Sequence, residues 1–365
     1  MFLGIFGELL GSGGIQRVNI HACATLSAVA KEKNETYKFL SLNDPNGVHE
    51  INAENHTFKI QGFGKNKTAF VFNCLKKISK INFVYISHPN MSPLGLIFKL
   101  LNLKIKYIVA IYGIDAWEKL SILKRLGMRW ANGITSVCKY TANKAANIQT
   151  IPNSKFFIIP SSLPDEVVHY KEDKDLIKPK DSSQKILLTV GRMSTLEQYK
   201  GMDLVIKSLP VILETIPNTF YYIVGEGDDM SRLKKLAADI GVEEHVIFTG
   251  KVGDELNSFY SLCDVFVMPS RDEGLSLVYV EAMALGNPVV ACNSGGTPEI
   301  VLEGETGFLV PYGDIKMLTD RLKILLADQS LCEKMGSLGR KRIHENFTFS
   351  HFKEKLTRVV TRIHD

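Results

Sequence analysis

Two carboxylates with seven residues between them, Glu273 and Glu281, are the first candidates for chemistry in this chain. Glu273 stands in a turn just before Gly274, whereas Glu281 falls in a stretch whose apolar residues recur at helical spacing. A turn that opens a helix presents backbone N–H groups, which bind phosphate readily. We therefore expect the amides of Gly274, Leu275 and Ser276 to bind phosphate. Glutamates on helices are usually only solvated, so this interpretation depends on the rest of the chain.

Two cations, Arg192 and Lys200, flank a loop that follows a predicted strand at residues 185–190. An arginine can bind phosphate oxygens with two parallel hydrogen bonds, and a lysine contributes a point charge. An isolated pair of this type is usually surface decoration. Because the loop and the Glu273 turn belong to the same predicted sheet, we predict that they converge on one diphosphate.

The glycine-rich segments discriminate between ligands. Gly11, Gly13 and Gly14 follow the first predicted strand and permit close approach of a ligand, although an ordinary turn would look similar. The sequence Val-Gly-Glu-Gly at 224–227 lacks the third glycine of a dinucleotide fingerprint, so we exclude a nicotinamide or flavin site. The turn at 248–252 ends another strand, where backbone groups could bind the edge of a nucleobase.

Strand-like and helical stretches alternate along the chain, which is typical of doubly wound parallel sheets. The first series of predicted strands comprises residues 2–6, 37–42, 56–61, 83–87, 107–111, 133–137 and 156–159. The second series comprises residues 185–190, 219–224, 245–248, 265–268, 288–291 and 307–310. We predict an α/β fold with two Rossmann-like, doubly wound domains facing across a cleft.

A polar and charged segment at 164–184, which contains Pro179, separates the two series and indicates an interdomain linker. We assign residues 1–165 to an N-terminal domain and residues 166–349 to a C-terminal domain. The length of 365 residues also favours two domains. The chain ends in a predicted basic amphipathic helix, and its residues 350–365 are candidates to pack back on the first domain.

The charges are distributed unevenly. Residues 1–165 carry 20 Lys and Arg against 9 Asp and Glu, a net charge of +11, whereas the remainder carries 24 against 30, a net charge of −6. A basic half suits an anionic partner, either a bilayer surface or a phosphorylated acceptor. No recognised nucleic-acid motif accompanies the charge, so we do not expect nucleic acid. The segment Leu94–Lys106 combines apolar residues with three lysines, and either contacts a membrane or forms a core helix with a solvated rim.

The composition, with 45% hydrophobic and 23% charged residues, is that of a globular protein. The six cysteines are scattered singly, which indicates a reducing compartment and no metal cluster. We find neither a basic leader nor an uncharged run of membrane-spanning length. We therefore predict a cytoplasmic protein, at most peripheral on the cytoplasmic face of a membrane, with no metal ion.

The motifs of the second series resemble those of the retaining GT-B glycosyltransferases of family 4. They follow in the same order over nearly all of residues 185–350: Gly191-Arg192, Lys200-Gly201, Val224-Gly-Glu-Gly, Phe248-Thr-Gly, Pro269-Ser, Glu273-x7-Glu281, Glu281-Ala-Met-Ala and Ser294-Gly-Gly-Thr-Pro-Glu299. In the first domain, Gly13-Gly-Ile-Gln-Arg17 is similar to the glycine loop of the family. Tyr112-Gly-Ile-Asp115 is similar to its His-Gly-x-Asp/Glu motif.

The resemblance implies a nucleotide-diphosphate sugar donor, a UDP- or GDP-sugar, and transfer with retained anomeric configuration. It implies no obligatory metal or other cofactor. By position, Arg192 and Lys200 would hold the diphosphate and stabilise the leaving nucleoside diphosphate, where negative charge grows. Gly13 and Gly14 would line the donor site from the first domain.

The remaining donor contacts follow from the same motifs. Glu273 would contact the donor sugar, with the amides of 274–276 on phosphate. Glu281 would bind the ribose hydroxyls, and Val252 would face the base. In the front-face mechanism of the family, the leaving phosphate acts as the base for the acceptor hydroxyl, so Glu273 is not assigned as a nucleophile.

One position departs from the family pattern. Tyr112 stands where the family usually has histidine, and tyrosine does not readily become a cation. Asp115, at the matching acidic position, is a candidate for contact with the donor sugar. His88, which follows another predicted strand, either substitutes for the missing histidine or serves a structural or acceptor-loop role.

We therefore predict a retaining glycosyltransferase that transfers a sugar to a glycan or lipid-linked glycan, in bacterial surface polysaccharide or lipopolysaccharide synthesis. The alternatives are a nucleotide-sugar epimerase or sugar phosphorylase of the same architecture, or an inactive sugar-nucleotide-binding subunit. A phosphorylase would need a lysine-bound pyridoxal phosphate or a phosphate site, which nothing in the sequence marks. The presence of Arg192, Lys200, Glu273 and Glu281 argues against an inactive subunit.

Overall fold

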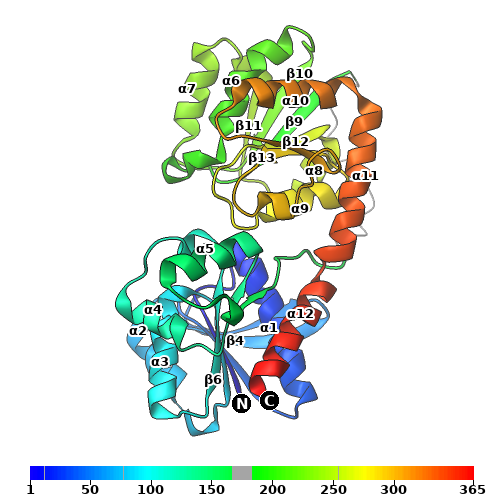
Figure 1. Ribbon diagram of the computed structural model, residues 1–365. Helices are drawn as coiled ribbons and strands as arrows, with labels where there is room; N and C mark the ends of the chain where they lie inside the picture. The colour runs from blue at the N-terminus through cyan, green and yellow to red at the C-terminus, as the bar shows by residue number, and fades with distance from the viewer. Residues whose placement is uncertain (12, 77, 167–182, 254) are drawn as a thin grey trace. The chain divides into compact units, whose positions relative to one another are not determined.

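The computed structural model describes the whole chain except residues 12, 77, 167–182 and 254. It divides into two compact units, one formed by Met1–Asp165 with Phe349–Asp365 and the other by Glu166–Thr348 (Figure 1). Most of the predicted linker at 164–184, including Pro179, lies outside the described residues. Each unit contains a sheet of parallel strands with helices packed on it, so the predicted fold class of two Rossmann-like α/β domains is confirmed.

The sheet of the first unit has eight strands in the order β3-β4-β2-β1-β5-β6-β7-β8. Every neighbouring pair is parallel except β3 with β4. The strands are β1 Phe2–Phe6, β2 Tyr37–Ser41, β3 Gly47–Ala53, β4 His56–Gly62, β5 Phe83–Ile86, β6 Lys106–Ile111, β7 Gly133–Ser136 and β8 Phe156–Ile158.

Strand β3 was not predicted. It forms an antiparallel hairpin with β4 through Glu54 and Asn55, whose φ angles are 54° and 58°. Two successive left-handed residues are typical of tight hairpin turns, but the usual signature is Asn-Gly or Asp-Gly rather than Glu-Asn. Ile51 is the one fully buried residue of β3, so the strand also lacks a strong apolar pattern.

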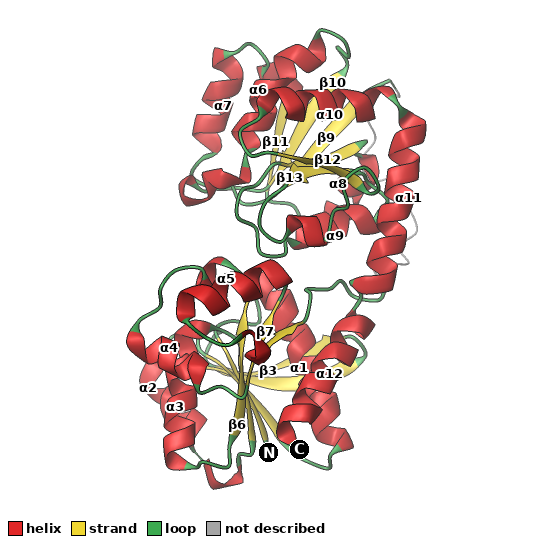
Figure 2. Ribbon diagram, in the orientation of Figure 1, coloured by secondary structure: helices red, strands yellow, loops and turns green. Residues whose placement is uncertain are grey.

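Helices cover both faces of this sheet (Figure 2). One apolar core lies between the strands, α1 and α12, and a second core on the other face receives residues of α2, α3, α4 and α5. The helices are α1 Gly14–Glu32, α2 Lys67–Leu75, α3 Ser92–Leu101, α4 Ile122–Arg129, α5 Lys139–Gln149 and α12 Phe349–His364.

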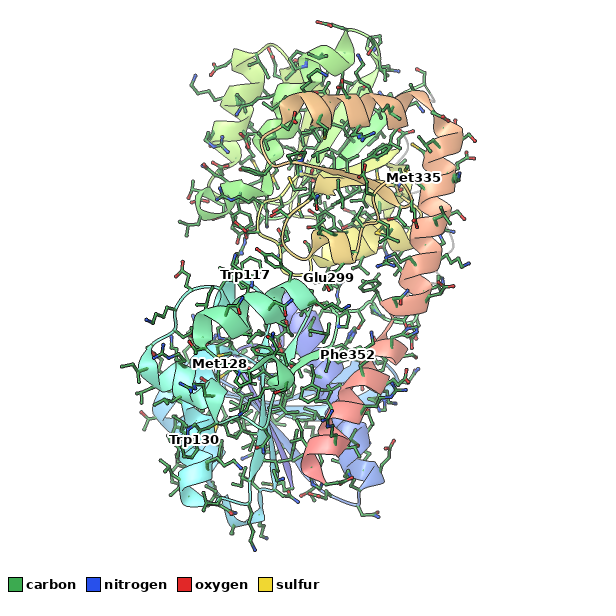
Figure 3. The ribbon with its side chains drawn as sticks, in the orientation of Figure 1. Trp117, Met128, Trp130, Glu299, Met335 and Phe352 are labelled. Atoms are coloured by element: carbon green, nitrogen blue, oxygen red, sulfur yellow. The ribbon has the colours of Figure 1, made fainter. Side chains whose placement is uncertain are left out.

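The C-terminal helix α12 belongs structurally to the first unit. It packs beside α1, and Phe352, Leu356 and Val360 are buried in the shared core (Figures 1 and 3). Its N-terminus is capped by Asp165, which accepts hydrogen bonds from the backbone N–H and the hydroxyl of Ser350 at 3.1 and 2.6 Å. The last helix therefore completes a core that the first 165 residues leave open.

The second unit has six parallel strands in the order β11-β10-β9-β12-β13-β14. They are β9 Lys185–Val190, β10 Thr219–Val224, β11 Val246–Gly250, β12 Val265–Met268, β13 Val289–Cys292 and β14 Gly307–Val310. The helices are α6 Met202–Leu213, α7 Met230–Asp239, α8 Leu256–Leu262, α9 Leu277–Ala284, α10 Ile315–Ala327 and α11 Gln329–Asn346. In Figure 3, Met335 marks α11, from which it enters the core of this unit.

Candidate active site

The loop after β9 and the turn after β12 meet at the carboxyl edge of the second sheet. Gly201 has a φ of 74°, and a Cβ there would lie 2.5 Å from the carbonyl oxygen of Pro269. The N–H of Arg271 also donates to the carbonyl of Tyr199 at 2.8 Å. Glycine at 201 is thus required both for the left-handed backbone and for this close approach.

Lys200 and Arg192 share one counterion in this loop. The Nζ of Lys200 lies 2.7 Å from Oε2 of Glu197, and Nη2 of Arg192 contacts Oε1 of the same carboxylate. Burial alone would raise the pKa of Glu197, but the Lys200 and Arg192 cations outweigh it and lower the pKa. The two predicted phosphate ligands are therefore brought together, through a carboxylate that was not predicted.

Glu273 lies beside this cluster. Its Oε1 accepts a hydrogen bond from the hydroxyl of Ser270 at 3.0 Å. Burial raises the pKa of Glu273, the charge of Lys200 and the Ser270 hydrogen bond lower it, and the nearby Glu197 raises it further. Because the raising contributions prevail, the carboxylate depends on a cationic environment to stay ionised.

The motif Ser294-Gly-Gly packs against the backbone of Glu273. The N–H of Gly296 donates to the carbonyl oxygen of Glu273 at 2.8 Å. Gly295 has a φ of 62°, and a Cβ there would lie 2.2 Å from that same carbonyl oxygen. The two glycines therefore hold the backbone of Glu273 in place, which accounts for part of a motif that the sequence alone left without a role.

Residues 274–276 form the turn that leads into α9, and Ser276 is the N-cap of that helix. The predicted phosphate-binding amides thus lie at the positive end of a helix dipole, one to three residues after Glu273.

Glu281 projects from α9 and is half-buried. Its Oε2 accepts a hydrogen bond from the hydroxyl of Tyr260 at 2.7 Å, and the ring of Tyr260 is fully buried. Val252 is half-buried just after β11, at the same edge of the sheet. Tyr260 was not predicted, because it lies on a different helix, α8, 21 residues before Glu281 in the chain.

The glycines of the 224–227 segment have a structural role. A Cβ at Gly225 would lie 2.0 Å from the carbonyl oxygen of Gly191, and one at Gly227 would lie 1.9 Å from that of Met193. Both glycines also have strongly positive φ angles, of 141° and 154°. They let the β10 loop pack directly against the Arg192 loop, and so help to shape it.

In the first unit, a buried aspartate organises the glycine loop after β1. Asp44 accepts hydrogen bonds from the backbone N–H groups of Leu9 and Leu10 at 2.8 and 3.1 Å, and from the hydroxyl of Ser41. Gly13 is the N-cap of α1, and Gly14 is its first residue. Asp44, which follows β2, therefore holds the backbone of the glycine loop at Leu9 and Leu10.

Tyr112 does not point freely into a binding site. Its hydroxyl donates to Oδ1 of Asn19 at 2.8 Å, and its ring packs against the core between the sheet and α1. The Nδ2 of Asn19 in turn donates to the carbonyl of Glu8 at 3.3 Å. Burial raises the pKa of Tyr112 well above its usual value, with smaller contributions from Tyr85 and Asp115.

Asp115 folds back on its own loop. Its Oδ1 accepts hydrogen bonds from the N–H groups of Tyr112 and Gly113 at 3.0 and 2.6 Å. Burial raises the pKa of Asp115 to about 6, although these backbone donors lower it. The carboxylate therefore shapes the loop. Because its pKa is about 6, it also titrates close to physiological pH.

His88 caps a short helical turn after β5. Its Nδ1 accepts a hydrogen bond from the N–H of Asn90 at 3.0 Å. Burial lowers the pKa of His88, and the nearby Lys124 lowers it further. The imidazole is therefore neutral at pH 7 and carries its proton on Nε2, which makes it a hydrogen-bond donor rather than a cation.

The candidate residues fall into two groups, which are described separately: Arg192, Lys200, Glu273, Glu281, Val252 and the 274–276 turn in the second unit, and Gly13, Gly14 and Asp115 in the first. No cluster of three or more His, Cys, Asp or Glu suited to a metal ion occurs in the described part of the chain.

Parts of the chain are similar to known proteins. Residues 171–342 match the family described as glycosyl transferases group 1. GDP-mannose-dependent alpha-(1-6)-phosphatidylinositol monomannoside mannosyltransferases are 42% identical over 42% of this chain in Mycolicibacterium smegmatis, and 33% identical over 66% in Mycobacterium tuberculosis. The matched regions span 43% and 65% of these two relatives, less than two thirds of either.

Among solved structures, HepE of Anabaena in complex with UDP superposes with a TM-score of 0.80 at 16% identity, over 99% of both chains. This likeness and the two Rossmann-like units define the fold as that called GT-B. Within this fold, residues 171–342 of the second unit are similar to the glycosyl transferases group 1 family.

Proposed function

We propose that this protein is a retaining glycosyltransferase that uses a nucleotide-diphosphate sugar and transfers the sugar to a hydroxyl of a glycan or lipid-linked glycan. The observation that carries the proposal is the convergence of Arg192, Lys200 and Glu273 at one edge of the second sheet. The M. smegmatis and M. tuberculosis relatives are named for GDP-mannose, and HepE was solved with UDP. Both a GDP-sugar and a UDP-sugar are therefore candidate donors.

In the proposed reaction, the bond between the anomeric carbon and the diphosphate oxygen breaks, and a bond to the acceptor oxygen forms on the same face. The acceptor proton passes to the departing phosphate oxygen. Arg192, Lys200 and the amides of 274–276 stabilise the negative charge that develops on the nucleoside diphosphate. No metal is needed for this step.

The other site residues bind the rest of the donor. Glu273, with its backbone fixed by the Ser294-Gly-Gly motif, contacts hydroxyls of the sugar. Glu281 binds the ribose, and Val252 faces the base. Gly13, Gly14 and Asp115 contribute from the first unit.

A thermal-shift panel of UDP- and GDP-sugars tests the donor, and glycan transfer with the stabilising donor tests the reaction. We expect Lys200→Ala and Glu273→Ala each to reduce the transfer rate at least about tenfold, equivalent to ~1.4 kcal/mol. Lys207→Ala and Glu214→Ala, in α6 and at its C-terminus, are matched controls. Near-normal rates in both site variants would refute the assignment.

Product analysis separates the alternatives. An epimerase would convert the donor sugar with no acceptor present, and a phosphorylase would need inorganic phosphate. An inactive subunit would bind the donor without releasing nucleoside diphosphate. Retention is checked by the anomeric configuration of the new linkage.

We further propose that the acceptor is lipid-linked, as in surface polysaccharide or lipopolysaccharide synthesis, and that the protein binds the cytoplasmic face of an anionic membrane through α4. The side chains of Ile122, Leu123 and Trp130 are 68%, 63% and 53% exposed. Lys124, Arg125 and Arg129 lie between Leu123 and Trp130 in the sequence. An apolar stripe with an aromatic residue and flanking cations suits a bilayer surface with anionic headgroups.

The segment Leu94–Lys106 contributes only its end to this surface. Leu94 and Phe98 are buried in the core, whereas Leu100, in the last turn of α3, and Leu103, just after the helix, are exposed. The core-helix alternative therefore holds for most of α3, and α3 packs against α4. In the described part of the chain, no helix has the length and apolarity to cross a bilayer.

Co-sedimentation with vesicles tests the membrane contact. Binding to phosphatidylcholine vesicles that contain phosphatidylglycerol should exceed binding to phosphatidylcholine alone, and should weaken as salt rises. Trp130→Ser should reduce it at least about fivefold, or ~1 kcal/mol. Ile324→Ser, on an exposed face of α10 in the second unit, is the control. Absence of binding at every salt concentration would refute this part of the proposal.

A further inference from the structure

Glu197 lies between the two cations to which the donor's diphosphate is assigned. Its Oε1 contacts Arg192 and its Oε2 lies 2.7 Å from Nζ of Lys200. The side chains of Glu197 and Lys200 are 17% and 16% exposed, whereas that of Arg192 is 70% exposed. One carboxylate thus pairs with both cations.

The loop that carries Glu197 is held on both sides of it. Thr195 donates to Asp228 through its N–H and its hydroxyl at 2.9 and 2.7 Å, and Gln198 donates to Asp229 at 3.0 Å. Gly201 is packed against Pro269. Because these anchors fix the backbone, Glu197 can leave the cations by rotating its side chain, without rearrangement of the loop.

The charges make simultaneous binding unfavourable. With Arg192, Lys200, Glu197 and Glu273 all ionised, the cluster has no net charge, so an incoming diphosphate meets two carboxylates as well as two cations. Like charges within a few ångströms in a partly buried site repel strongly. Either the diphosphate replaces Glu197 on the cations, or it binds weakly.

We propose that Glu197 is a specificity-determining internal competitor: it occupies Arg192 and Lys200 in the free enzyme, yields them to a diphosphate, and reclaims them as the nucleoside diphosphate leaves. This inference rests on the proposed role of the two cations. A diphosphate has oxygens on two phosphorus atoms with which to satisfy both cations, whereas a monophosphate has fewer and less charge. Glu197 therefore favours nucleoside diphosphates over monophosphates.

The opposing possibility is that Glu197 positions Arg192 and Lys200 for the ligand. The two roles predict opposite changes when the charge is removed. Glu197→Gln keeps the size of the side chain but removes its charge. If Glu197 competes with the ligand, Glu197→Gln strengthens diphosphate binding. If Glu197 positions the two cations, the same change weakens diphosphate binding.

Isothermal titration calorimetry of the full chain with UDP, GDP and their monophosphates distinguishes these outcomes. For Glu197→Gln we expect the Kd of the preferred diphosphate to fall at least about fivefold, equivalent to ~1 kcal/mol. The Kd of the monophosphate should fall by a larger factor, so the preference for diphosphate decreases. Inhibition of transfer by the product nucleoside diphosphate should become stronger in the same proportion.

Asp239→Asn is the matched control, because it removes one carboxylate from an exposed pair with Lys235 on α7 and changes the net charge equally. It should leave every Kd unchanged. Glu197→Asp keeps the charge on a shorter side chain and should give an intermediate affinity, which provides a second test if Glu197→Gln folds poorly.

If the wild-type protein binds a diphosphate and Glu197→Gln binds it equally or more weakly, the competitor role is refuted. The proposed function is not affected by that result. If the wild-type protein binds neither UDP nor GDP, the proposed function itself fails. A gain that Asp239→Asn reproduces would be a general charge effect and would also overturn the inference.

Discussion

The hydroxyl of Tyr112 and the side-chain oxygen of Asn19 lie 2.8 Å apart in a hydrogen bond that joins the loop after β6 to helix α1 in the first unit. Asn19 also donates to the carbonyl of Glu8 in the glycine loop. The tyrosine that replaces the histidine of the family motif is therefore a structural group, with its hydroxyl already engaged.

Tyr112→Phe should accordingly destabilise the protein more than it slows the reaction. Leaving the buried Oδ1 of Asn19 without its donor should lower the free energy of unfolding by about 1–3 kcal/mol. The transfer rate below the unfolding temperature should stay within about threefold of wild type, or ~0.7 kcal/mol. Tyr37→Phe, at a half-buried tyrosine of the same unit, serves as the comparison. A loss of more than tenfold in rate with unchanged stability would instead place Tyr112 at the substrate.

The alternation of strands and helices was enough to predict both sheets, because parallel strands buried on two faces give continuous apolar runs. Strand β1, which is buried throughout, shows this pattern clearly. Strand β3 was missed because one face is solvated and its hairpin turn uses Glu54 and Asn55. The order of strands was not predictable, since it depends on contacts between segments far apart in the chain.

For the candidate site, residues at strand ends were easier to predict than the groups that hold them. Arg192, Lys200 and Glu273 lie in the connections that follow strands β9 and β12, so the edge of the sheet at which they lie could be inferred. Their partners come from elsewhere: Tyr260 reaches Glu281 from another helix. Glu197 differs from Tyr260, because it stands between two predicted phosphate ligands in the sequence. It could therefore have been predicted, but it was not.

The raised pKa of Asp115 predicts an acid limb in the activity of the enzyme. Burial raises this pKa to about 6, so the ionised form, which we propose to accept hydrogen bonds from the donor sugar, is lost as the pH falls through 6. Transfer measured from pH 5 to 8 should decline below about pH 6. Asp115→Asn should be slower at pH 8 and should lack this decline. If the variant kept the same acid limb, another group, such as Glu273, would be responsible.

The raised pKa of Asp115 also makes the free energy of unfolding depend on pH. Because the folded pKa exceeds the unfolded value, the folded state binds the proton more tightly between about pH 4 and 6, and the ionised carboxylate is a cost above pH 6. The free energy of unfolding of Asp115→Asn relative to wild type should therefore increase by up to about 3 kcal/mol from pH 4 to pH 7. Denaturant unfolding at the two pH values measures this, and a difference that does not depend on pH would contradict it.

Tyr260→Phe tests whether the buried phenol orients Glu281 toward the ribose. Removing the hydroxyl frees Oε2 of Glu281 and should weaken nucleoside diphosphate binding by about three- to tenfold, or ~1 kcal/mol. Binding of the 2′-deoxy and 3′-deoxy nucleotides should weaken less, because one ribose contact is already absent. Equal weakening for all nucleotides would mean that Tyr260 only supports the fold. Tyr221→Phe, which removes another buried hydroxyl of this unit, is the control.

The packing of α12 predicts that the last residues of the chain stabilise the first unit. Leu356 is fully buried between α12 and the core shared with α1. Leu356→Ala should lower the free energy of unfolding by about 2–5 kcal/mol, because it removes buried apolar contacts and leaves a cavity. Arg358→Ala, at an exposed site of the same helix, should change it by less than about 0.5 kcal/mol. Hydrogen exchange locates the effect: in Leu356→Ala, protection should fall in α1 and β1 and remain in β9 and β12. Equal loss of protection in both units would show that the two units unfold together, and an unchanged unfolding free energy would show that α12 is not part of the core.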